Sequence, residues 1–221
     1  DAETGTVLYE KNADTMMHPA SMSKLMTVAM LFDRLADGSV KMEDSFPVSE
    51  SAWRIQGSKM FVELGARIPV SDLLRGIIIQ SGNDACIVVA EGLGGDEHNF
   101  ARMMTERARE IGMTHAEFRN SSGWPDPEHL MTARDLATLA AYLVNTHKQY
   151  YSIFSEMDFT WHAIKQGNRN PLLYSYPGAD GLKTGHTEEA GYGLTGSAVR
   201  NGRRLIVVVT GLESDKRRGI E

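Results

Sequence analysis

Three short strings in this chain supply the residues that an acyl-transferring serine enzyme needs. They are Ser21-Met22-Ser23-Lys24, Ser81-Gly82-Asn83 and Lys183-Thr184-Gly185, in that order. A serine hydroxyl is a poor nucleophile until a base removes its proton, and a lysine can be that base when burial or a nearby cation lowers its pKa. Each string alone is common by chance, so the hypothesis depends on their order, spacing and context.

The first two strings offer a nucleophile, a base and polar positioning groups. Ser21 and Lys24 lie three residues apart and therefore share one face of a helix. Lys24 stands among apolar neighbours, which predicts that its ammonium is desolvated or directed into a polar site. Ser81 is a candidate proton relay, and the Asn83 amide is a candidate ligand for a substrate carbonyl.

The third string adds a cation and a binding edge. Lys183 is a second cation that lowers the pKa of Lys24, and Thr184 offers a hydroxyl to a carboxylate. Gly185 lets a substrate backbone approach the strand edge closely. Taken singly, each string also has an ordinary structural interpretation: a lysine reaching to solvent, helix caps, or polar residues on an exposed edge strand.

Backbone N–H groups on opposite sides of the site are candidate oxyanion donors. We assign them to Ser21 and His186 on position alone, because the first N–H groups of a helix point toward developing negative charge.

The elements that must position these strings are readable from periodicity. Residues 6–9 predict a strand, and residues 21–35 predict a buried helix that Asp37-Gly38 ends. Near the C-terminus, Asn201-Gly202 is a strong hairpin signal. The remaining elements that we expect are helices over 70–80, 83–92, 97–111 and 133–145, the third capped by Asp96 and the last by Thr132 and Asp135, and strands over 181–187, 192–199 and 204–211.

Composition narrows the function classes. The 221 residues are 42% hydrophobic and carry a formal charge of −6, which disfavours nucleic acid as a partner. The short basic run at 216–218 is expected to be a solvated chain end. The apolar stretch at 25–32 is too short to span a membrane, and the first residues do not show the charged-then-apolar pattern expected of a secretory leader. The single cysteine, Cys86, is expected to be a buried core residue.

Competing motifs are weaker. Residues 191–196 match a dinucleotide-binding spacing but lead into a hairpin instead of a helix. The chain has no His-Glu-x-x-His pair and no Gly-x-Ser-x-Gly elbow, which disfavours a zinc hydrolase and an α/β-hydrolase. The pair Asp126 and Glu128 is expected to form a turn.

The strings resemble the active-site motifs of penicillin-binding proteins and serine β-lactamases. With their flanks, 19–27, 80–85 and 180–187, they are most similar to low-molecular-mass D-alanyl-D-alanine carboxypeptidases. Ser81 follows Ser21 by 60 residues and Lys183 follows Ser81 by 102, which also suits that group. The segment Asn168-Arg169-Asn170 resembles the one whose arginine holds the terminal carboxylate of the substrate.

The resemblance implies a mixed α/β fold of the β-lactamase/transpeptidase type, with an antiparallel sheet flanked by helices and a mainly helical subdomain. Residues 1–221 would form a single catalytic domain, its sheet lobe drawn from both ends of the chain and its helical lobe from the middle. The leader, a final helix after Glu221, a further β-rich domain and an amphipathic membrane anchor would lie outside this sequence.

The resemblance also implies a chemistry. Ser21 attacks the D-Ala-D-Ala amide and Lys24 takes its proton, so that a covalent acyl-enzyme forms. The other implied roles are proton delivery to the departing D-alanine by Ser81 and Lys183, carboxylate binding by Thr184 and Arg169, and peptide positioning by Asn83. β-Lactam antibiotics would acylate Ser21 and leave slowly, and no metal or organic cofactor is implied.

The same resemblance implies that the partner is a peptidoglycan stem peptide, with no nucleic acid. The location would be periplasmic or extracytoplasmic, with membrane contact only through segments absent from this chain. Three rivals stay open: a D,D-endopeptidase, a serine β-lactamase, and a non-catalytic β-lactam sensor or peptidoglycan-binding module. The β-lactamase is disfavoured because no Glu-x-x-Leu-Asn string occurs and Gly82 stands where those enzymes usually carry Asp.

Overall fold

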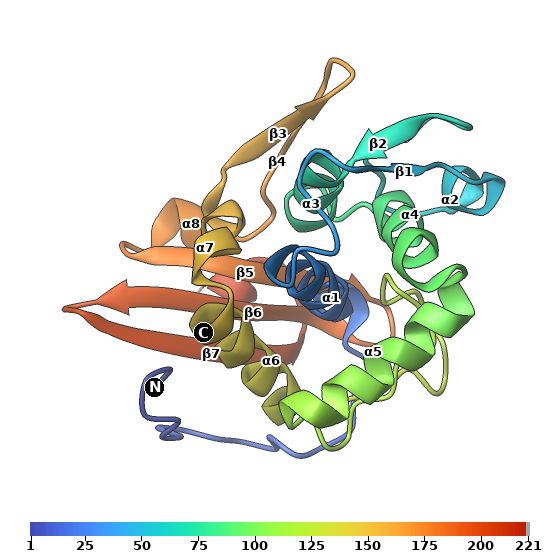
Figure 1. Cartoon of the computed structure of the whole chain (residues 1–221). Coiled ribbons are helices and arrows are strands. Elements are labelled where there is room, and N and C mark those ends of the chain that lie inside the picture. Colours follow the sequence, from blue (N-terminus) through green and yellow to red (C-terminus); the bar gives the residue numbers. More distant parts are fainter. Residues whose placement is uncertain (220–221) are drawn as a thin grey trace.

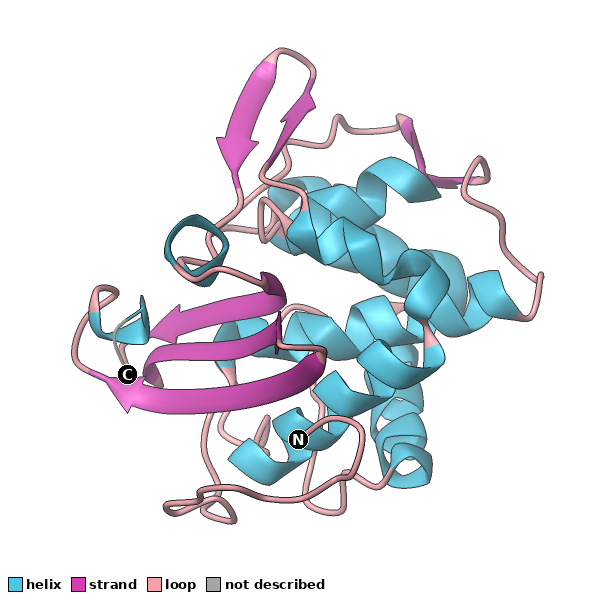
Figure 2. Ribbon diagram, turned by 90° about the vertical axis from the view of Figure 1, so that its left-hand side faces the viewer, coloured by secondary structure: helices cyan, strands magenta, loops and turns pink. Residues whose placement is uncertain are grey.

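A computed structural model describes residues 1–219; Glu221, after which a final helix was expected, lies outside the described residues. The fold is mixed α/β, with a three-stranded antiparallel sheet beside a larger group of helices (Figures 1 and 2). The principal helices are α1 (Lys24–Ala36), α3 (Val70–Ile78), α4 (Asn83–Gly94), α5 (Glu97–Ile111) and α6 (Ala133–Thr146). The sheet consists of β5 (Ala179–Thr187), β6 (Gly191–Arg200) and β7 (Arg203–Leu212).

The predicted C-terminal hairpin is confirmed. Strands β6 and β7 pair antiparallel through the turn at Asn201 and Gly202, whose φ angles are 51° and 74°. Two consecutive left-handed residues match the twist of a hairpin, which is why Asn-Gly is favoured there. Strand β5 pairs with the other edge of β6, placing Lys183 opposite Thr195. Residues 191–196 are therefore strand, not a dinucleotide-binding loop.

Helix α1 is the central element of the core. Ten of its residues are buried, and it contacts α3, α4, α5, α6 and β5. The predicted helix over 21–35 is confirmed with one difference: its first turn is the 3-10 helix η1 (Ala20–Ser23). Helices α1 and α6 also pack against the sheet, so one apolar layer joins the two parts of the molecule.

The other predicted helices are confirmed to within a few residues. Asp96 caps α5 through the N–H of Asn99. Thr132 and Asp135 form the expected capping box at the start of α6. These ends were readable because a short polar side chain at the N-cap satisfies N–H groups that the helix leaves unpaired.

Several short elements were not predicted. They are β1 (Ser45–Pro47) paired with β2 (Arg67–Pro69), β3 (Asp158–Trp161) paired with β4 (Ile164–Gly167), and α2 (Glu50–Arg54), α7 (Lys148–Tyr151), η2 (Ser152–Ser155), α8 (Leu172–Ser175) and η3 (Arg217–Gly219). The β3–β4 hairpin projects from the body of the molecule, as Figure 2 shows.

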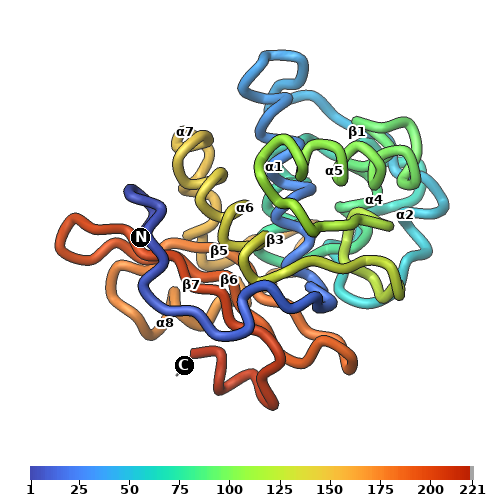
Figure 3. Tube along the Cα trace, turned by 90° about the horizontal axis from the view of Figure 1, so that it is seen from below, coloured from blue at the N-terminus to red at the C-terminus, as the bar shows by residue number. Residues whose placement is uncertain are grey.

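The prediction of a strand over residues 6–9 is wrong. Residues 6–9 have no regular secondary structure, and Val7, Leu8 and Tyr9 are exposed. Figures 1 and 3 show this segment running past the β7 side of the sheet toward α1. The chain start reaches β7 at Asp1, whose carboxylate pairs with Arg203, and at Ala2, which donates its N–H to Arg204 O. A β-prone run becomes a strand only where a partner edge pairs with it, and residues 6–9 do not pair with β7.

The basic run at 216–218 was expected to be a solvated chain end, but one of its side chains packs against the sheet. The Arg218 guanidinium lies 5.1 Å from the centre of the Tyr192 ring on β6, a cation–π contact. Cys86 is fully buried, as expected. Within residues 1–219, no helix combines the length and the apolar character that crossing a membrane would require.

Candidate active site

The first string lies at the start of the buried helix. Ser21 sits on η1 and is partly exposed, whereas Lys24, the first residue of α1, is only 1% exposed. Lys24 Nζ lies 2.8 Å from Ser21 Oγ. The three-residue spacing that predicted this pairing therefore does place the hydroxyl and the amine within hydrogen-bond distance.

Lys24 is held by two further oxygens from distant parts of the chain. Its Nζ donates to Asn83 Oδ1 at 2.8 Å and to the Ser122 carbonyl at 2.8 Å. Neither oxygen can donate a proton. A neutral Lys24 therefore keeps its two N–H groups on these acceptors, and its lone pair faces Ser21 Oγ. This is the arrangement in which an amine can take the hydroxyl proton.

Burial, with a smaller contribution from the charge of Arg169, lowers the pKa of Lys24 to about 8, against the opposing charge of Asp84. Its three hydrogen-bond partners are uncharged and do not offset the loss of water around the ammonium. Cys86 lies nearby, but burial raises the pKa of this thiol to about 12, so it is neutral near pH 7 and brings no charge. A substantial fraction of Lys24 is consequently unprotonated at mildly alkaline pH.

The second string forms the junction between α3 and α4. Ser81 adopts a left-handed φ of 56° and is 1% exposed, and its Oγ has no hydrogen-bond partner within residues 1–219. Asn83 uses both ends of its amide, because Nδ2 donates to Gln56 O at 2.8 Å while Oδ1 accepts from Lys24. One Nδ2 hydrogen of Asn83 remains for another acceptor.

Glycine is required between these two residues. A Cβ on Gly82 would come 2.8 Å from Asp84 Oδ1 and 3.0 Å from the backbone nitrogen of Met60. The Asp84 carboxylate accepts the N–H groups of Met60, Phe61 and Val62 at 2.8–3.1 Å. The position therefore has no room for the Asp that is usual in the β-lactamases considered above.

The third string lies on β5, which contacts η1. Lys183 is 3% exposed, and its Nζ donates to Thr184 O at 3.1 Å. Its pKa falls well below the ordinary value because of burial, then because of the charges of Lys24 and Arg169. The two lysines are thus close enough to repel, and their shared surroundings disfavour two ammonium groups at once.

Gly185 lies against the turn that carries Ser21. A Cβ there would lie 2.9 Å from Pro19 O, 3.2 Å from Ala20 Cβ and 3.2 Å from the backbone nitrogen of Met22. The close approach is therefore to the nucleophile turn itself. His186 follows Gly185 on β5, and its ring stacks on Tyr192 with 3.9 Å between the ring centres. Because β5 contacts η1, the backbones of His186 and Ser21 belong to two elements in contact.

Arg169 lies in the segment between β4 and α8. It is exposed, and Nη1 donates to Ser58 Oγ at 2.7 Å. Burial of part of the side chain and the charge of Arg218 lower its pKa. Arg218, which was expected to lie at a solvated chain end, is therefore one of the cations around the site.

The loop over residues 120–124 was missed as part of the site. It supplies the Ser122 carbonyl, and a Cβ on Gly123 would lie 1.9 Å from Ala20 O. Thr27 Oγ1 on α1 also donates to Ser121 O at 2.6 Å. A sequence signal existed, since the stretch between α5 and α6 is long for a connection within a compact domain.

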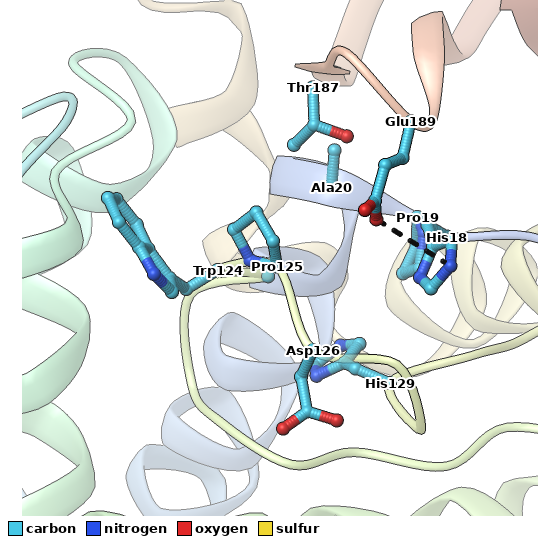
Figure 4. A pocket seen from close by; sticks show the side chains of 10 residues that line it. His18, Pro19, Ala20, Trp124, Pro125, Asp126, His129, Thr187 and Glu189 are labelled. Carbon is cyan, nitrogen blue, oxygen red and sulfur yellow. Dashed lines mark ion pairs between the residues drawn. The ribbon is translucent and has the colours of Figure 1, made fainter.

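A small pocket lies beside the nucleophile turn, with Trp124, Pro125, Asp126 and His129 on one side of Ala20 and His18 and Glu189 on another (Figure 4). His18 Nε2 and Glu189 Oε2 are 3.8 Å apart. The pocket borders the turn that carries Ser21, but neither lysine of the site lines it. Within the described residues, no group of three or more His, Cys, Asp or Glu side chains is placed to hold a metal ion.

These groups together can activate a hydroxyl for attack on a carbonyl. The structure brings Ser21, Lys24 and Asn83 together directly, and it places Lys183 and Arg169 close enough for their charges to act on the site. A model of a peptidase family, Peptidase_S11, described as D-alanyl-D-alanine carboxypeptidase, matches residues 1–214.

Individual relatives found by sequence and by structure carry the same activity in their names. D-alanyl-D-alanine carboxypeptidase DacA of Haemophilus influenzae is 38% identical over 100% of this chain and 58% of its own length. The chain thus spans little more than half of this curated relative. The crystal structure of D-alanyl-D-alanine carboxypeptidase DacD from Francisella tularensis has a TM-score of 0.98 at 32% identity, over 100% of this chain and 66% of that one.

A further similar structure contains a β-lactam. It is penicillin-binding protein D2 of Listeria monocytogenes in the cefotaxime-bound form, with a TM-score of 0.88 and 30% identity. The match covers 98% of this chain and 89% of that one. The expected fold, of the type found in penicillin-binding proteins, is therefore confirmed.

Proposed function

The chain belongs to the Peptidase_S11 family of D-alanyl-D-alanine carboxypeptidases, and on this premise we propose that it is a serine D,D-carboxypeptidase. The reaction removes the terminal D-alanine from peptidoglycan stem pentapeptides through an acyl-enzyme. The observation that carries the proposal is the 2.8 Å contact between Ser21 Oγ and the buried Lys24 amine, whose hydrogen-bond partners carry no charge.

In the acylation step, Ser21 Oγ attacks the carbonyl carbon between the two D-alanines. Lys24 Nζ takes the hydroxyl proton as the new C–O bond forms. The backbone N–H groups of Ser21 and His186 stabilise the oxyanion from η1 and β5, the two elements that touch at Gly185. Asn83 binds the peptide of the substrate through its remaining Nδ2 hydrogen.

The leaving group needs a proton and a binding site. Ser81 and Lys183 deliver the proton to the departing amine, since Ser81 Oγ is buried with no partner within residues 1–219. The free carboxylate of the terminal D-alanine binds Thr184 and Arg169. Cleavage of the C–N bond releases D-alanine, and water then hydrolyses the ester on Ser21 to give the shortened stem peptide.

The same acylation makes the protein a target of β-lactam antibiotics. A β-lactam amide presents a carbonyl and a nearby carboxylate, so it occupies the same groups and forms an ester with Ser21. The name and bound ligand of the similar Listeria protein support this kind of inhibitor. Release of the adduct is slow, because the sequence has no Glu-x-x-Leu-Asn string to place a carboxylate base for hydrolysis of the ester.

We assign residues 1–221 to one catalytic domain and its location to the periplasm or another extracytoplasmic compartment, where peptidoglycan lies. The names of the relatives support this location, since their substrate is a cell-wall peptide.

The proposal is tested with diacetyl-lysyl-D-Ala-D-Ala and a fluorescent penicillin. We expect many equivalents of D-alanine per enzyme, and we expect Ser21→Ala to abolish both turnover and labelling while the exposed Ser51→Ala control changes neither. A single equivalent of D-alanine, or none, would make the chain a sensor. Faster release from cross-linked dimeric peptides than from the pentapeptide would make it an endopeptidase, and rapid recovery from the penicillin adduct would make it a β-lactamase.

A further inference from the structure

The turn that carries Ser21 is not stable by its own local structure. Ala20 adopts a φ of 51°, a left-handed conformation that costs a residue with a Cβ free energy. The preceding Pro19 offers no side-chain cap to η1. Such a strained single turn persists only where its surroundings hold it, so the contacts of η1 decide where Ser21 Oγ lies.

Two of these contacts are packing contacts, one is a hydrogen bond between a nitrogen and an oxygen, and Thr195 Oγ1 also donates to Met22 Sδ on η1 at 3.4 Å. Gly185 on β5 and Gly123 on the 120–124 loop both press against the Ala20 region, as described above. The hydrogen bond joins Ser23 Oγ to His129 Nε2 at 2.7 Å, across 106 residues of sequence. Both side chains are buried, at 0% and 2% exposed.

The hydrogen bonds of His129 fix its tautomer. The backbone N–H of Arg119 donates to His129 Nδ1 at 3.1 Å, so Nδ1 is an acceptor and the ring proton is on Nε2. Nε2 therefore donates to Ser23 Oγ. Burial lowers the pKa of His129 to about 4, which keeps the ring neutral near pH 7. The Phe118 ring packs edge-on against the imidazole at 5.4 Å and fixes its plane.

Ser23 lies between the two residues that must meet. It follows the nucleophile by two positions and precedes Lys24, so a rotation of η1 about its axis changes the distance between Ser21 Oγ and Lys24 Nζ. Lys24 itself is fixed by Asn83 and Ser122. The Ser23–His129 hydrogen bond, with the longer contact of Thr195 Oγ1 to Met22 Sδ beside it, then sets the orientation of the serine side of the pair.

We propose that His129 is a positioning residue for the acylation step, acting through Ser23 to hold η1 so that Ser21 Oγ stays within reach of Lys24. The proposal rests on the proposed function of Ser21 as nucleophile. His129 also lines the small pocket beside Ala20, with Asp126 next to it in Figure 4. A shorter side chain at this position would open Ser23 to water from that pocket.

The test compares two neutral amides of different reach. The amide nitrogen of His129→Gln extends about as far as Nε2 and donates to Ser23, whereas His129→Asn reaches only the position of Nδ1 and satisfies Arg119. We expect His129→Gln to keep the penicillin acylation constant and kcat for the D-Ala-D-Ala peptide within about threefold. His129→Asn should lower both by roughly 30-fold with KM nearly unchanged.

Ser23→Ala serves as the second arm, and the exposed His98→Asn as the control, for which no change is expected. We expect Ser23→Ala to match His129→Asn, and the double variant to lose no more than either single one. Losses that add in the double variant, or equal losses in the Gln and Asn variants, would overturn the proposal, as would losses that simply follow the melting temperature. Failure of the unaltered protein to be acylated would instead overturn the proposed function.

Discussion

The surroundings of the two buried lysines differ in how many partners hold each amine. Lys24 Nζ lies within hydrogen-bond distance of oxygens on Ser21, Asn83 and Ser122, which come from three separate segments. Lys183 Nζ has one hydrogen-bond acceptor within the described residues, the carbonyl of the adjacent Thr184. The difference indicates that the Lys24 geometry is built before substrate arrives, whereas Lys183 keeps donor capacity for groups that the substrate brings.

Removing each amine is the strongest test of that contrast. We expect Lys24→Met to lower the acylation constant for penicillin by about 10³-fold, because the general base is lost. Lys183→Met should lower it by about 10²-fold or less and should raise KM for the peptide. Rapid-mixing kinetics with a fluorescent penicillin give both values, and a larger loss for Lys183→Met would reverse the assignment of the base.

A second test moves the two sides of the site apart without removing a polar group. The Cβ of Gly185→Ala meets Pro19 O and Ala20 Cβ and must push β5 away from η1, which should slow acylation by about 10- to 100-fold. Gly167→Ala on β4 is the matched control, since its nearest atom would be Tyr174 Oη at 3.5 Å. Equal activity in the two variants would show that the approach of β5 to η1 does not matter.

The pH dependence of acylation tests whether the charge of Arg169 lowers the pKa of the two lysines. With the pKa of Lys24 lowered to about 8, the acylation constant should rise tenfold per pH unit below that value and level off above it. Arg169→Gln removes a positive charge that lowers the pKa of both lysines, so the midpoint should move to higher pH. A midpoint that stays in place or moves down would contradict this coupling.

The same variant tests how the carboxylate is bound. Arg169→Gln should weaken use of the free D-Ala-D-Ala peptide by about tenfold more than acylation by a neutral ester substrate. Equal losses with the two substrates would remove Arg169 from the binding of the terminal carboxylate and leave it an electrostatic role alone.

The smallest effect is expected where the fold, and not the site, is altered. Thr132→Ala removes the capping box of α6 and should cost about 1 kcal/mol in the free energy of unfolding, measured in urea. Acylation should not change, because packing and not this cap holds the Lys24 partners. A parallel loss of acylation would show that the Lys24 geometry depends on the α6 terminus.

Local signals predicted the longer helices and the three strands of the C-terminal sheet. The apolar run after Pro19 gave α1, Asn201-Gly202 gave the hairpin, and the polar residues at 96, 132 and 135 gave the helix starts. Each of these depends on residues close in sequence. The predicted strand over 6–9 depended on pairing with a distant edge, which β-propensity alone does not guarantee.

The active site could be predicted only in part, because some of its contacts join residues that are far apart in the sequence. The i, i+3 spacing predicted that Ser21 and Lys24 lie together, and side-chain chemistry together with the family resemblance suggested the roles of Asn83 and Lys183. The Ser122 carbonyl, 98 residues from Lys24, carries no side-chain signature, since any residue has a carbonyl. The Ser23–His129 bond was equally invisible, because a histidine near Asp126 and Glu128 looks like part of a surface turn.

Mapping a penicillin adduct by mass spectrometry tests the central claim most directly, because it asks which hydroxyl the buried Lys24 amine activates. The account predicts one equivalent of penicillin attached at Ser21, with the adduct lost in Ser21→Ala. An adduct on Ser23, Ser81 or any other residue, or no covalent adduct in the folded protein, would contradict it.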